Sequence, residues 1–241
     1  MGSKKRLSKK IWEDICKEVP ITEDTYFVDL FCGGCSVVGG VPLKNRIAND
    51  LNTPLISYLK KIVEDTNWLP NENFLTKTMY NHIKRNKHLY KPFFLGYVGF
   101  NFSYGASYFQ GFIGNERNHA ITARKSALKD AEKLKGVKFY NMDYKDVPIP
   151  PKSIVYCDIP YKGTASYNGN EKGFNYDEFF RYAQKLKDEG HYVFISECTQ
   201  EVPKDFKLIA KYQRSSNMCN GSKARKGRKF TYEKFKKRKV V

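Results

Sequence analysis

Residues 25–40 read TYFVDLFCGGCSVVGG, and this stretch predicts how the chain folds. Its first seven residues are rich in the aromatic and β-branched side chains that favour strands, and a glycine turn follows directly. A strand that runs into a glycine turn is typical of the first βα unit of nucleotide-binding sheets. The glycines do not form a GxGxxG motif, and similar turns follow strands in folds that bind no nucleotide. The stretch therefore indicates an α/β sheet and leaves its ligand open.

The segments on either side continue this alternation. We expect helices near residues 8–19, 53–63, 121–135 and 177–189, and further strands within 46–52, 137–144, 153–159 and 191–197. Ser8 is predicted to cap the first helix, which should end before Pro20, and Gly136 and Gly190 are predicted to stop the last two. Strands that alternate with helices and end in polar residues predict a Rossmann-like parallel sheet.

Two segments depart from this pattern. Residues 67–118 begin with a short helical piece and continue into a stretch with ten aromatic rings and no clean period, so we expect an inserted subdomain with most rings in its core. Residues 214–241 hold eleven Lys or Arg and one acid. This composition is typical of a solvated tail, but the interleaved Phe230, Tyr232 and Phe235 equally favour a late hairpin that lies on a polyanion.

The composition favours a polyanionic partner. The chain has 43 Lys and Arg against 25 Asp and Glu, a formal net charge of +18. Nucleic acid is the leading candidate partner because each phosphate that the protein neutralises releases counterions. The alternative explanation of the charge is a protein with Lys-rich faces exposed to solvent. No apolar run approaches the roughly 20 residues that span a bilayer, and MGSKKRLSKK lacks the apolar core of a secretory signal. We therefore expect a cytoplasmic protein without membrane contact.

The cysteines give little reason to expect a metal. All six are expected to be reduced thiols in a cytoplasmic protein. Cys32 and Cys35 form a CxxC pair, which could indicate zinc or redox chemistry. Since no second CxxC or HxxxH follows, we expect no metal site.

Three predicted strands end in carboxylates, and ligands of open parallel sheets bind beyond such ends. Asp29 ends the first strand next to Gly33 and Gly34, which let a ligand approach the backbone. Asp50 follows 21 residues later, where an acid can accept both hydroxyls of a ribose, although a helix cap is the alternative. Asp158 opens the sequence DIPY, whose carboxylate, free backbone carbonyl and aromatic ring suit a planar base with an exocyclic amine. A strand-terminating turn with a buried tyrosine is the alternative there.

These motifs together resemble one family. VDLFCGGCS, NDLN, MDY and YCDIPY, in this order and with an aromatic-rich insert, resemble the Dam-type N6-adenine DNA methyltransferases, especially the compact forms found in phages. The opening GSKKRLSKKI is similar to the N-terminal motif of that family. The resemblance implies a Rossmann-like S-adenosylmethionine-dependent methyltransferase sheet in segments 1–66 and 119–241, with a mainly helical target-recognition subdomain inserted at 67–118.

The resemblance also implies roles for individual residues. The implied cofactor-binding residues are Gly2, Ser3, Lys4, Asp29, Phe31, Gly33, Gly34, Asp50, Asp143 and Tyr144. The first three would hold the methionine end of S-adenosylmethionine, Asp50 the ribose hydroxyls, and Asp143 would lie near the cofactor adenine. The implied catalytic residues are Asp158, Ile159, Pro160 and Tyr161. From the distribution of charge we expect DNA contacts at Lys84, Arg85, Lys87, Lys91, Arg117, Arg124, Lys125 and Lys162.

Two positions depart from the family pattern. Cys35 stands where the last glycine of FxGxG is usual, and Ile159 replaces the first proline of DPPY. The turn at Ile159 is therefore expected to be less rigid than in the family. Residues 162–174, rich in glycine and polar side chains, are expected to form a mobile loop that closes over the target base.

The implied reaction transfers a methyl group from S-adenosylmethionine to N6 of a flipped adenine at specific sites in double-stranded DNA. Because the N6 lone pair is delocalised into the ring, the amine must be held by Asp158 and the Ile159 carbonyl while Tyr161 stacks on the base. No obligatory protein partner is evident, and a role in a bacterial or phage-infected cell, as in restriction-modification, would fit. Two alternatives remain open: methylation of N4 of cytosine or of an RNA adenine, and an inactive DNA-binding relative.

Overall fold

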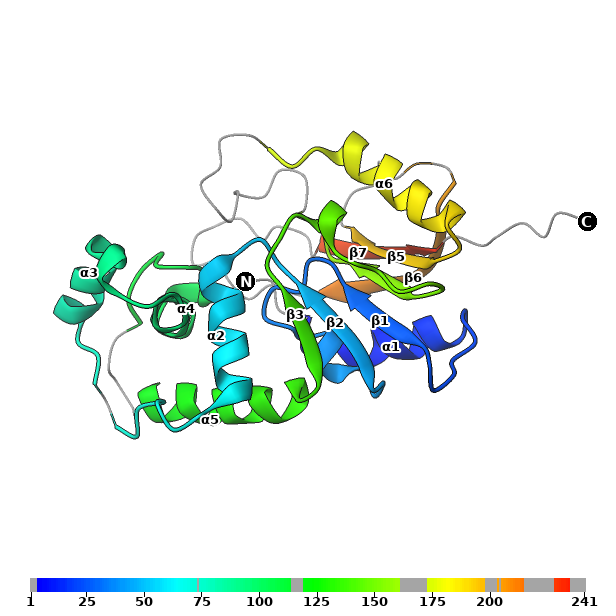
Figure 1. The fold of residues 1–241 in the computed structure, drawn as a ribbon. Coiled ribbons are helices and arrows are strands. Elements are labelled where there is room, and N and C mark those ends of the chain that lie inside the picture. The colour runs from blue at the N-terminus through cyan, green and yellow to red at the C-terminus, as the bar shows by residue number, and fades with distance from the viewer. Residues whose placement is uncertain are drawn as a thin grey trace, which may run out of the picture.

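The computed structural model describes residues 4–72, 74–113, 119–160, 173–197, 203, 205–214 and 228–234. A seven-stranded sheet forms its centre, in the order β3-β2-β1-β4-β5-β7-β6 (Figure 1). The strands are β1 (Tyr26–Asp29), β2 (Asn45–Asn49), β3 (Val137–Tyr140), β4 (Ile154–Cys157), β5 (Tyr192–Glu197), β6 (Lys207–Arg214) and β7 (Arg228–Lys234). The first five are parallel, and β7 runs antiparallel to both of its neighbours. The fold is therefore the expected α/β Rossmann-like methyltransferase sheet.

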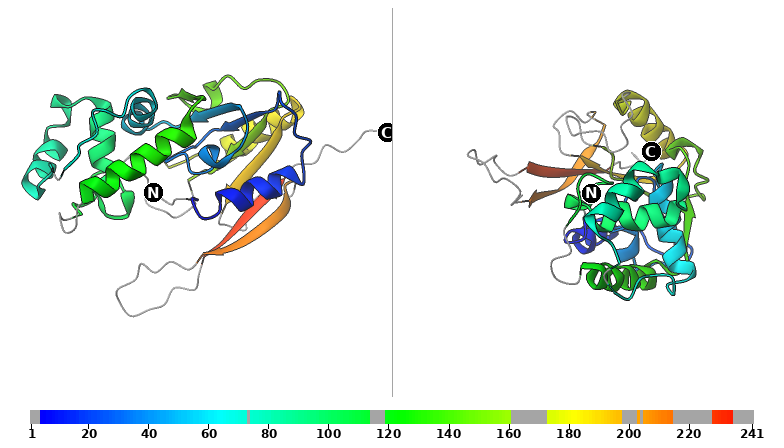
Figure 2. Two further views of the ribbon diagram at one scale, coloured as in Figure 1. Left: turned by 90° about the horizontal axis from the view of Figure 1, so that it is seen from below. Right: turned by 90° about the vertical axis from the view of Figure 1, so that its left-hand side faces the viewer.

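Helices cover both faces of the sheet. The helices of more than one turn are α1 (Ser8–Cys16), α2 (Thr53–Glu64), α3 (Lys77–Arg85), α4 (Pro92–Asn101), α5 (His119–Leu134) and α6 (Tyr176–Asp188). Residues of α1, α2 and α5 share one hydrophobic core with Phe27 of β1, whereas α6 packs into a second core that contains Val28. Alternate side chains of β1 thus point to opposite layers. Figures 1 and 2 show α6 on the other side of the sheet from α1 and α5.

The helix boundaries follow the local signals with one exception. Asn52 caps α2 by accepting a hydrogen bond from the Leu55 N–H at 3.0 Å, and Gly136 and Gly190 after α5 and α6 have φ values of +77° and +92°. The predicted cap of α1 was wrong. Ser8 lies inside the helix and its hydroxyl donates to the Lys5 carbonyl, so Leu7 takes the cap position without a side-chain bond. The helix ends at Cys16, which lies before Pro20 as expected.

The aromatic stretch forms a helix that its sequence does not predict. In α4, six consecutive residues from Leu95 to Phe100 are buried, so the helix has no polar face and no amphipathic period. Gly96 lets α4 pack closely on α2, because a Cβ there would lie 2.1 Å from the Pro54 carbonyl oxygen. Tyr97 is fully buried, while Tyr104 is 63% exposed.

This helix also connects the insert to the rest of the molecule. The hydrophobic core of α3 and α4 is continuous with that of α2, α5 and the sheet, although the two helices lie to one side of the sheet in Figure 1. Two short 3-10 helices, η2 (Lys87–Leu89) and η3 (Tyr104–Ala106), complete the described part of the segment. The division at residues 67 and 118 stays a prediction.

The basic C-terminal region forms a hairpin within residues 205–214 and 228–234. β7 pairs with β5 and β6 lies outside it, so the pair extends one edge of the sheet (Figure 2). The Tyr212 hydroxyl of β6 donates to the Asp14 carboxylate of α1. Within the described residues the structure therefore contains the hairpin, and its contact with a polyanion stays a prediction.

Candidate active site

The three carboxylates predicted from the sequence lie at the same edge of the sheet. Asp29 is the last residue of β1, Asp50 directly follows β2, and Asp158 directly follows β4. These three strands are neighbours, with β1 in the middle, and the chain order reverses between β1 and β4. Such a reversal is where ligands bind in open α/β sheets. The electrostatic coupling of Asp29 to both Asp50 and Asp158 agrees with this arrangement.

Asp29 is a buried carboxyl without a complete set of partners. It is 1% exposed, and its Oδ1 atom has no hydrogen-bond partner among the described residues. Burial raises the pKa of Asp29 well above its usual range, and the negative charge of Asp158 raises it further. The backbone N–H groups of Phe31 and Val38 oppose this shift. A buried acceptor that lacks a donor is costly unless a ligand or water supplies one.

The glycine turn holds the second carboxylate. Asp50 accepts hydrogen bonds from the Gly33 N–H at 3.0 Å on Oδ2 and from the Asn52 N–H at 2.9 Å on Oδ1. Burial raises the pKa of Asp50, while these two N–H groups oppose the shift. Because each carboxylate oxygen can accept more than one hydrogen bond, acceptor capacity remains on both oxygens. The carboxylate is therefore fixed in direction and still able to accept from a ligand.

Cys35 occupies a strained position in the same turn. Its φ is +55°, close to the +49° of Gly33, and both values lie in the left-handed region that favours glycine. Cys35 therefore has a backbone conformation that glycine adopts at lower cost. Cys32 and Cys35 are buried free thiols. Burial raises the pKa of the Cys32 thiol, and its hydrogen bond with the Cys35 side chain raises that pKa further. Within the described ranges, no group of three or more His, Cys, Asp or Glu side chains could hold a metal ion.

The third carboxylate forms an ion pair with the N-terminal segment. Lys4 Nζ lies 2.6 Å from Asp158 Oδ1, with the lysine 4% exposed and the aspartate 22% exposed. The Lys4 carbonyl accepts hydrogen bonds from the N–H groups of Leu7 and Ser8, so the start of α1 fixes its backbone. Lys4 was predicted as a cofactor residue, and the structure brings it to the carboxylate predicted for the target base.

The two residues after Asp158 are held by the second core and by α6. Ile159 is 2% exposed and packs in the core that contains Cys157 and Phe179. The Pro160 carbonyl accepts a hydrogen bond of 2.8 Å from the Tyr176 hydroxyl. Tyr161 lies outside the described residues, as do Gly2, Ser3, Arg117 and Lys162 and all but the last two residues of the expected loop 162–174.

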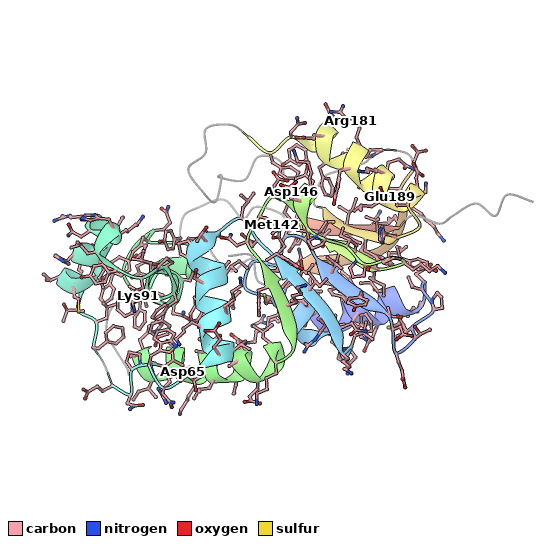
Figure 3. The ribbon with its side chains drawn as sticks, in the orientation of Figure 1. Asp65, Lys91, Met142, Asp146, Arg181 and Glu189 are labelled. Carbon is pink, nitrogen blue, oxygen red and sulfur yellow. The ribbon has the colours of Figure 1, made fainter. Side chains whose placement is uncertain are left out.

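Aromatic rings form a wall beside the glycine turn. The centroids of Phe31 and Tyr144 are 5.2 Å apart, and Phe174 and Phe179 each lie 5.8 Å from Phe31. Burial raises the pKa of Tyr144 to about 12. Asp143 caps the short helix η4 (Tyr144–Asp146) by accepting from the Lys145 N–H at 3.0 Å. Figure 3 labels Met142, which directly precedes Asp143, and Asp146, the last residue of η4.

Two asparagines that the sequence analysis missed tie the strand ends together. The Asn49 amide donates to the carbonyls of Leu30 and Met142, both at 3.1 Å, and so joins the segments after β1 and β3 to β2. Asn141 donates to the Asp50 carbonyl at 2.8 Å. An NDLN motif indicates a polar strand end, but it does not predict which distant carbonyls will accept hydrogen bonds from its side chains.

The predicted DNA contacts fall into two groups. Lys84, Arg85, Lys87, Lys91 and Lys125 are exposed. By contrast, the Arg124 guanidinium is partly buried and donates to the Leu69 carbonyl, which gives it a structural contact. The Lys87 ammonium also lies 4.9 Å from the centroid of the Tyr108 ring.

A cavity of about 500 Å³ lies elsewhere, near the amino ends of the strands. Its lining includes Tyr26, Lys44, Lys138 and Pro150 and none of the predicted site residues. The three carboxylates lie at the carboxyl ends of the strands, so the candidate site and this cavity are separate features.

The sheet order and the carboxylates at its switch point fit the α/β fold of the S-adenosylmethionine-dependent methyltransferases. Residues 1–218 match the family described as D12 class N6 adenine-specific DNA methyltransferase. Because the match covers most of the chain, the protein belongs to this family. It is an adenine-specific DNA methyltransferase with S-adenosylmethionine as its cofactor and DNA as its substrate. No helix in the described part of the chain is long and apolar enough to cross a membrane.

Similar solved structures are also methyltransferases. The rRNA methyltransferase aviRa from Streptomyces viridochromogenes is 10% identical, with a TM-score of 0.46, over 95% of this chain and 84% of that chain. SMU.472, a putative methyltransferase complexed with SAH, is 14% identical, with a TM-score of 0.40, over 100% of this chain and 54% of that chain. A putative class I S-adenosylmethionine-dependent methyltransferase (lmo1582) from Listeria monocytogenes is 8% identical, with a TM-score of 0.39, over 98% and 61%. No curated protein sequence matches the chain.

Proposed function

We propose that this methyltransferase modifies N6 of an adenine that is flipped out of double-stranded DNA, with Asp158 as the residue that holds the amine. The observation that carries the proposal is the position of Asp158, which is partly exposed at the switch point beside the buried Asp29. A carboxylate at this edge can accept a hydrogen bond from a ligand that approaches the ends of β1 and β4.

The residues around the glycine turn fit the cofactor. Asp29 has an unpartnered buried oxygen, Asp50 has a fixed carboxylate, and the rings of Phe31 and Tyr144 provide an apolar wall. When bound, S-adenosylmethionine supplies an electrophilic methyl group on a sulfonium. We assign Asp50 to its ribose hydroxyls, Gly33, Gly34 and Phe31 to its methionine side, and Asp143 to the region of its adenine. Gly2, Ser3 and Lys4 would hold the methionine end.

The residues of the DIPY turn prepare the target amine. Asp158 and the Ile159 carbonyl would each accept one hydrogen of the N6 amine, which lets the nitrogen become more pyramidal and localises its lone pair. Tyr161 would stack on the base, an interaction worth roughly 1–3 kcal/mol. Because Lys4 occupies Asp158 Oδ1 at 2.6 Å, the amine would use the other oxygen or displace the lysine.

The surface charge supports duplex DNA as the partner. The exposed cations of α3, η2 and the start of α4 lie in the segment that we propose reads the target, and the whole chain carries a formal charge of +18. Phosphate contacts of this kind position a protein on DNA without reading its sequence. We propose no obligatory protein partner for the reaction.

The test is a transfer assay with labelled S-adenosylmethionine on matched double-stranded DNA, single-stranded DNA and RNA, followed by digestion to nucleosides. The proposal predicts labelled N6-methyl-2′-deoxyadenosine from the duplex and an increase in 2-aminopurine fluorescence when that base replaces the target adenine. Label on N4 of cytosine, or transfer to RNA alone, would overturn the proposal. Folded protein that binds DNA without transfer would favour the inactive relative.

A further inference from the structure

The turn that carries Asp158 lacks a restraint that its family pattern contains. A proline at position 159 would fix φ near −65°, whereas an isoleucine before Pro160 can adopt a wider range of φ. The turn is nevertheless tethered on its inner side, because the Ile159 side chain is 2% exposed in the second core. Packing restrains the side chain of Ile159, but it does not fix the backbone carbonyls that follow. A second tether is therefore needed at the next peptide.

Tyr176 supplies such a contact from another element. Its hydroxyl donates to the Pro160 carbonyl at 2.8 Å, across a sequence separation of 16 residues. This carbonyl belongs to the peptide that leads into Tyr161. A carbonyl with a well-placed donor keeps its peptide plane in one orientation, so the bond restrains the direction in which the chain leaves the turn.

The position of the Tyr176 hydroxyl is itself well defined. Tyr176 is the first residue of α6, and Asn175 caps the helix by accepting from the Glu178 N–H at 3.1 Å. The ring packs edge-on against Phe174 with centroids 5.1 Å apart, and Phe174 contacts Phe31 at the glycine turn. Phe179, one turn further along α6, lies in the same core as Ile159. One helix therefore holds the turn through a core contact and through a hydrogen bond.

We infer that Tyr176 is a positioning residue for methyl transfer, which orients the Asp158–Pro160 turn in place of the missing proline. This inference rests on the proposed function, because it assumes that the turn holds the target amine. Tyr176 acts through the Pro160 carbonyl, and its role differs from that of a residue that only stabilises the fold. A positioning role should affect kcat and base binding while leaving the affinity for the cofactor unchanged.

The experiment compares Tyr176→Phe, Ile159→Pro and the double variant with the wild-type protein. Loss of the hydroxyl should lower kcat about 3- to 10-fold, the range expected from the net contribution of one hydrogen bond. The Kd for S-adenosylmethionine, measured by calorimetry, should stay within twofold. In the Ile159→Pro background the same substitution should change kcat by less than twofold, because the proline restores the restraint. Tyr192→Phe, at the amino end of β5, is the matched control and should leave kcat unchanged.

A second background keeps the test decisive if Ile159→Pro does not fold. Ile159→Val loosens the buried anchor, so Tyr176→Phe should then lower kcat by more than it does in the wild-type background. If Tyr176→Phe lowers kcat by the same factor in every background, or does not lower kcat at all in an active protein, the inference alone is overturned. An inactive wild-type protein that binds both S-adenosylmethionine and DNA would overturn the proposed function first, and the inference with it.

Discussion

Lys4 and Asp158 are 154 residues apart in the sequence, and Lys4 Nζ lies 2.6 Å from Asp158 Oδ1. With the lysine only 4% exposed, its ammonium group has lost most of its hydration and is compensated by this carboxylate. The pair fixes the N-terminal segment to the end of β4. It also joins a residue assigned to the cofactor with one assigned to the target base.

Replacement of Lys4 should destabilise the protein. Lys4→Met leaves the Asp158 charge without this partner, and we expect the free energy of unfolding to fall by roughly 1–3 kcal/mol. The loss should be smaller than for a fully buried pair because Asp158 is 22% exposed. Urea unfolding followed by circular dichroism measures it. Lys4→Met with Asp158→Asn should recover part of the loss, and strictly additive losses would contradict the pairing.

A matched control for this prediction lies in α1. Lys9 is 89% exposed and its Nζ is 3.9 Å from Glu13 Oε1, so Lys9→Met should change the free energy of unfolding by less than about 0.5 kcal/mol. A similar loss in both variants would show that lysine replacement in this segment acts through something other than the ion pair.

Local signals in the sequence predicted the parts of the fold that depend on neighbouring residues. The first five strands and the three strand-end carboxylates all follow from short stretches. Helix α4 could not be predicted, because a buried helix with Gly96 and Gly99 shows neither polar alternation nor high helix propensity. Its glycines serve contacts with α2 and Tyr108 that only the tertiary structure creates.

The candidate site was predictable in its residue types and less so in its pairings. Asp158 was identified from the chemistry of DIPY, yet nothing local indicates that Lys4 would reach it from the other end of the chain. Asn49 and Tyr176 were missed for the same reason, since each donates to a carbonyl that is distant in sequence. The predicted Ser8 cap failed because helix α1 already includes Ser8.

Removal of the Asp158 carboxylate should separate binding from chemistry. Asp158→Ala should reduce methyl transfer by on the order of 10²-fold or more, the size of effect seen when a group that stabilises the reacting centre is lost. DNA affinity should change little, because most of that affinity comes from phosphate contacts elsewhere. Transfer of labelled methyl and a fluorescence anisotropy titration with duplex DNA measure the two effects. Asp24→Ala, in an exposed loop before β1, is the control that should retain full activity.

Asp29 should make stability depend on pH in a defined direction. Its pKa is raised in the folded protein by burial and by Asp158, so the folded state binds the proton more tightly than the unfolded state, whose pKa is about 3.9. Stability from this group is therefore fully present below about pH 4 and is lost as pH rises through the folded pKa. The difference in unfolding free energy between wild type and Asp29→Asn should fall from pH 4 upward and then level off. A difference that stays constant with pH would contradict this assignment.

Because Cys35 is strained, its glycine variant should be more stable than its alanine variant, which reverses the usual order of stability. At φ +55° a side chain with a Cβ costs roughly 1–2 kcal/mol, so Cys35→Gly should be more stable than Cys35→Ala even though both remove the buried sulfur. Cys157 is the matched control, since it is buried in strand β4, where glycine is less favourable than alanine. Urea unfolding of the four variants should therefore give opposite orders at the two positions. The same order at both would mean that Cys35 stores no backbone strain in the glycine turn.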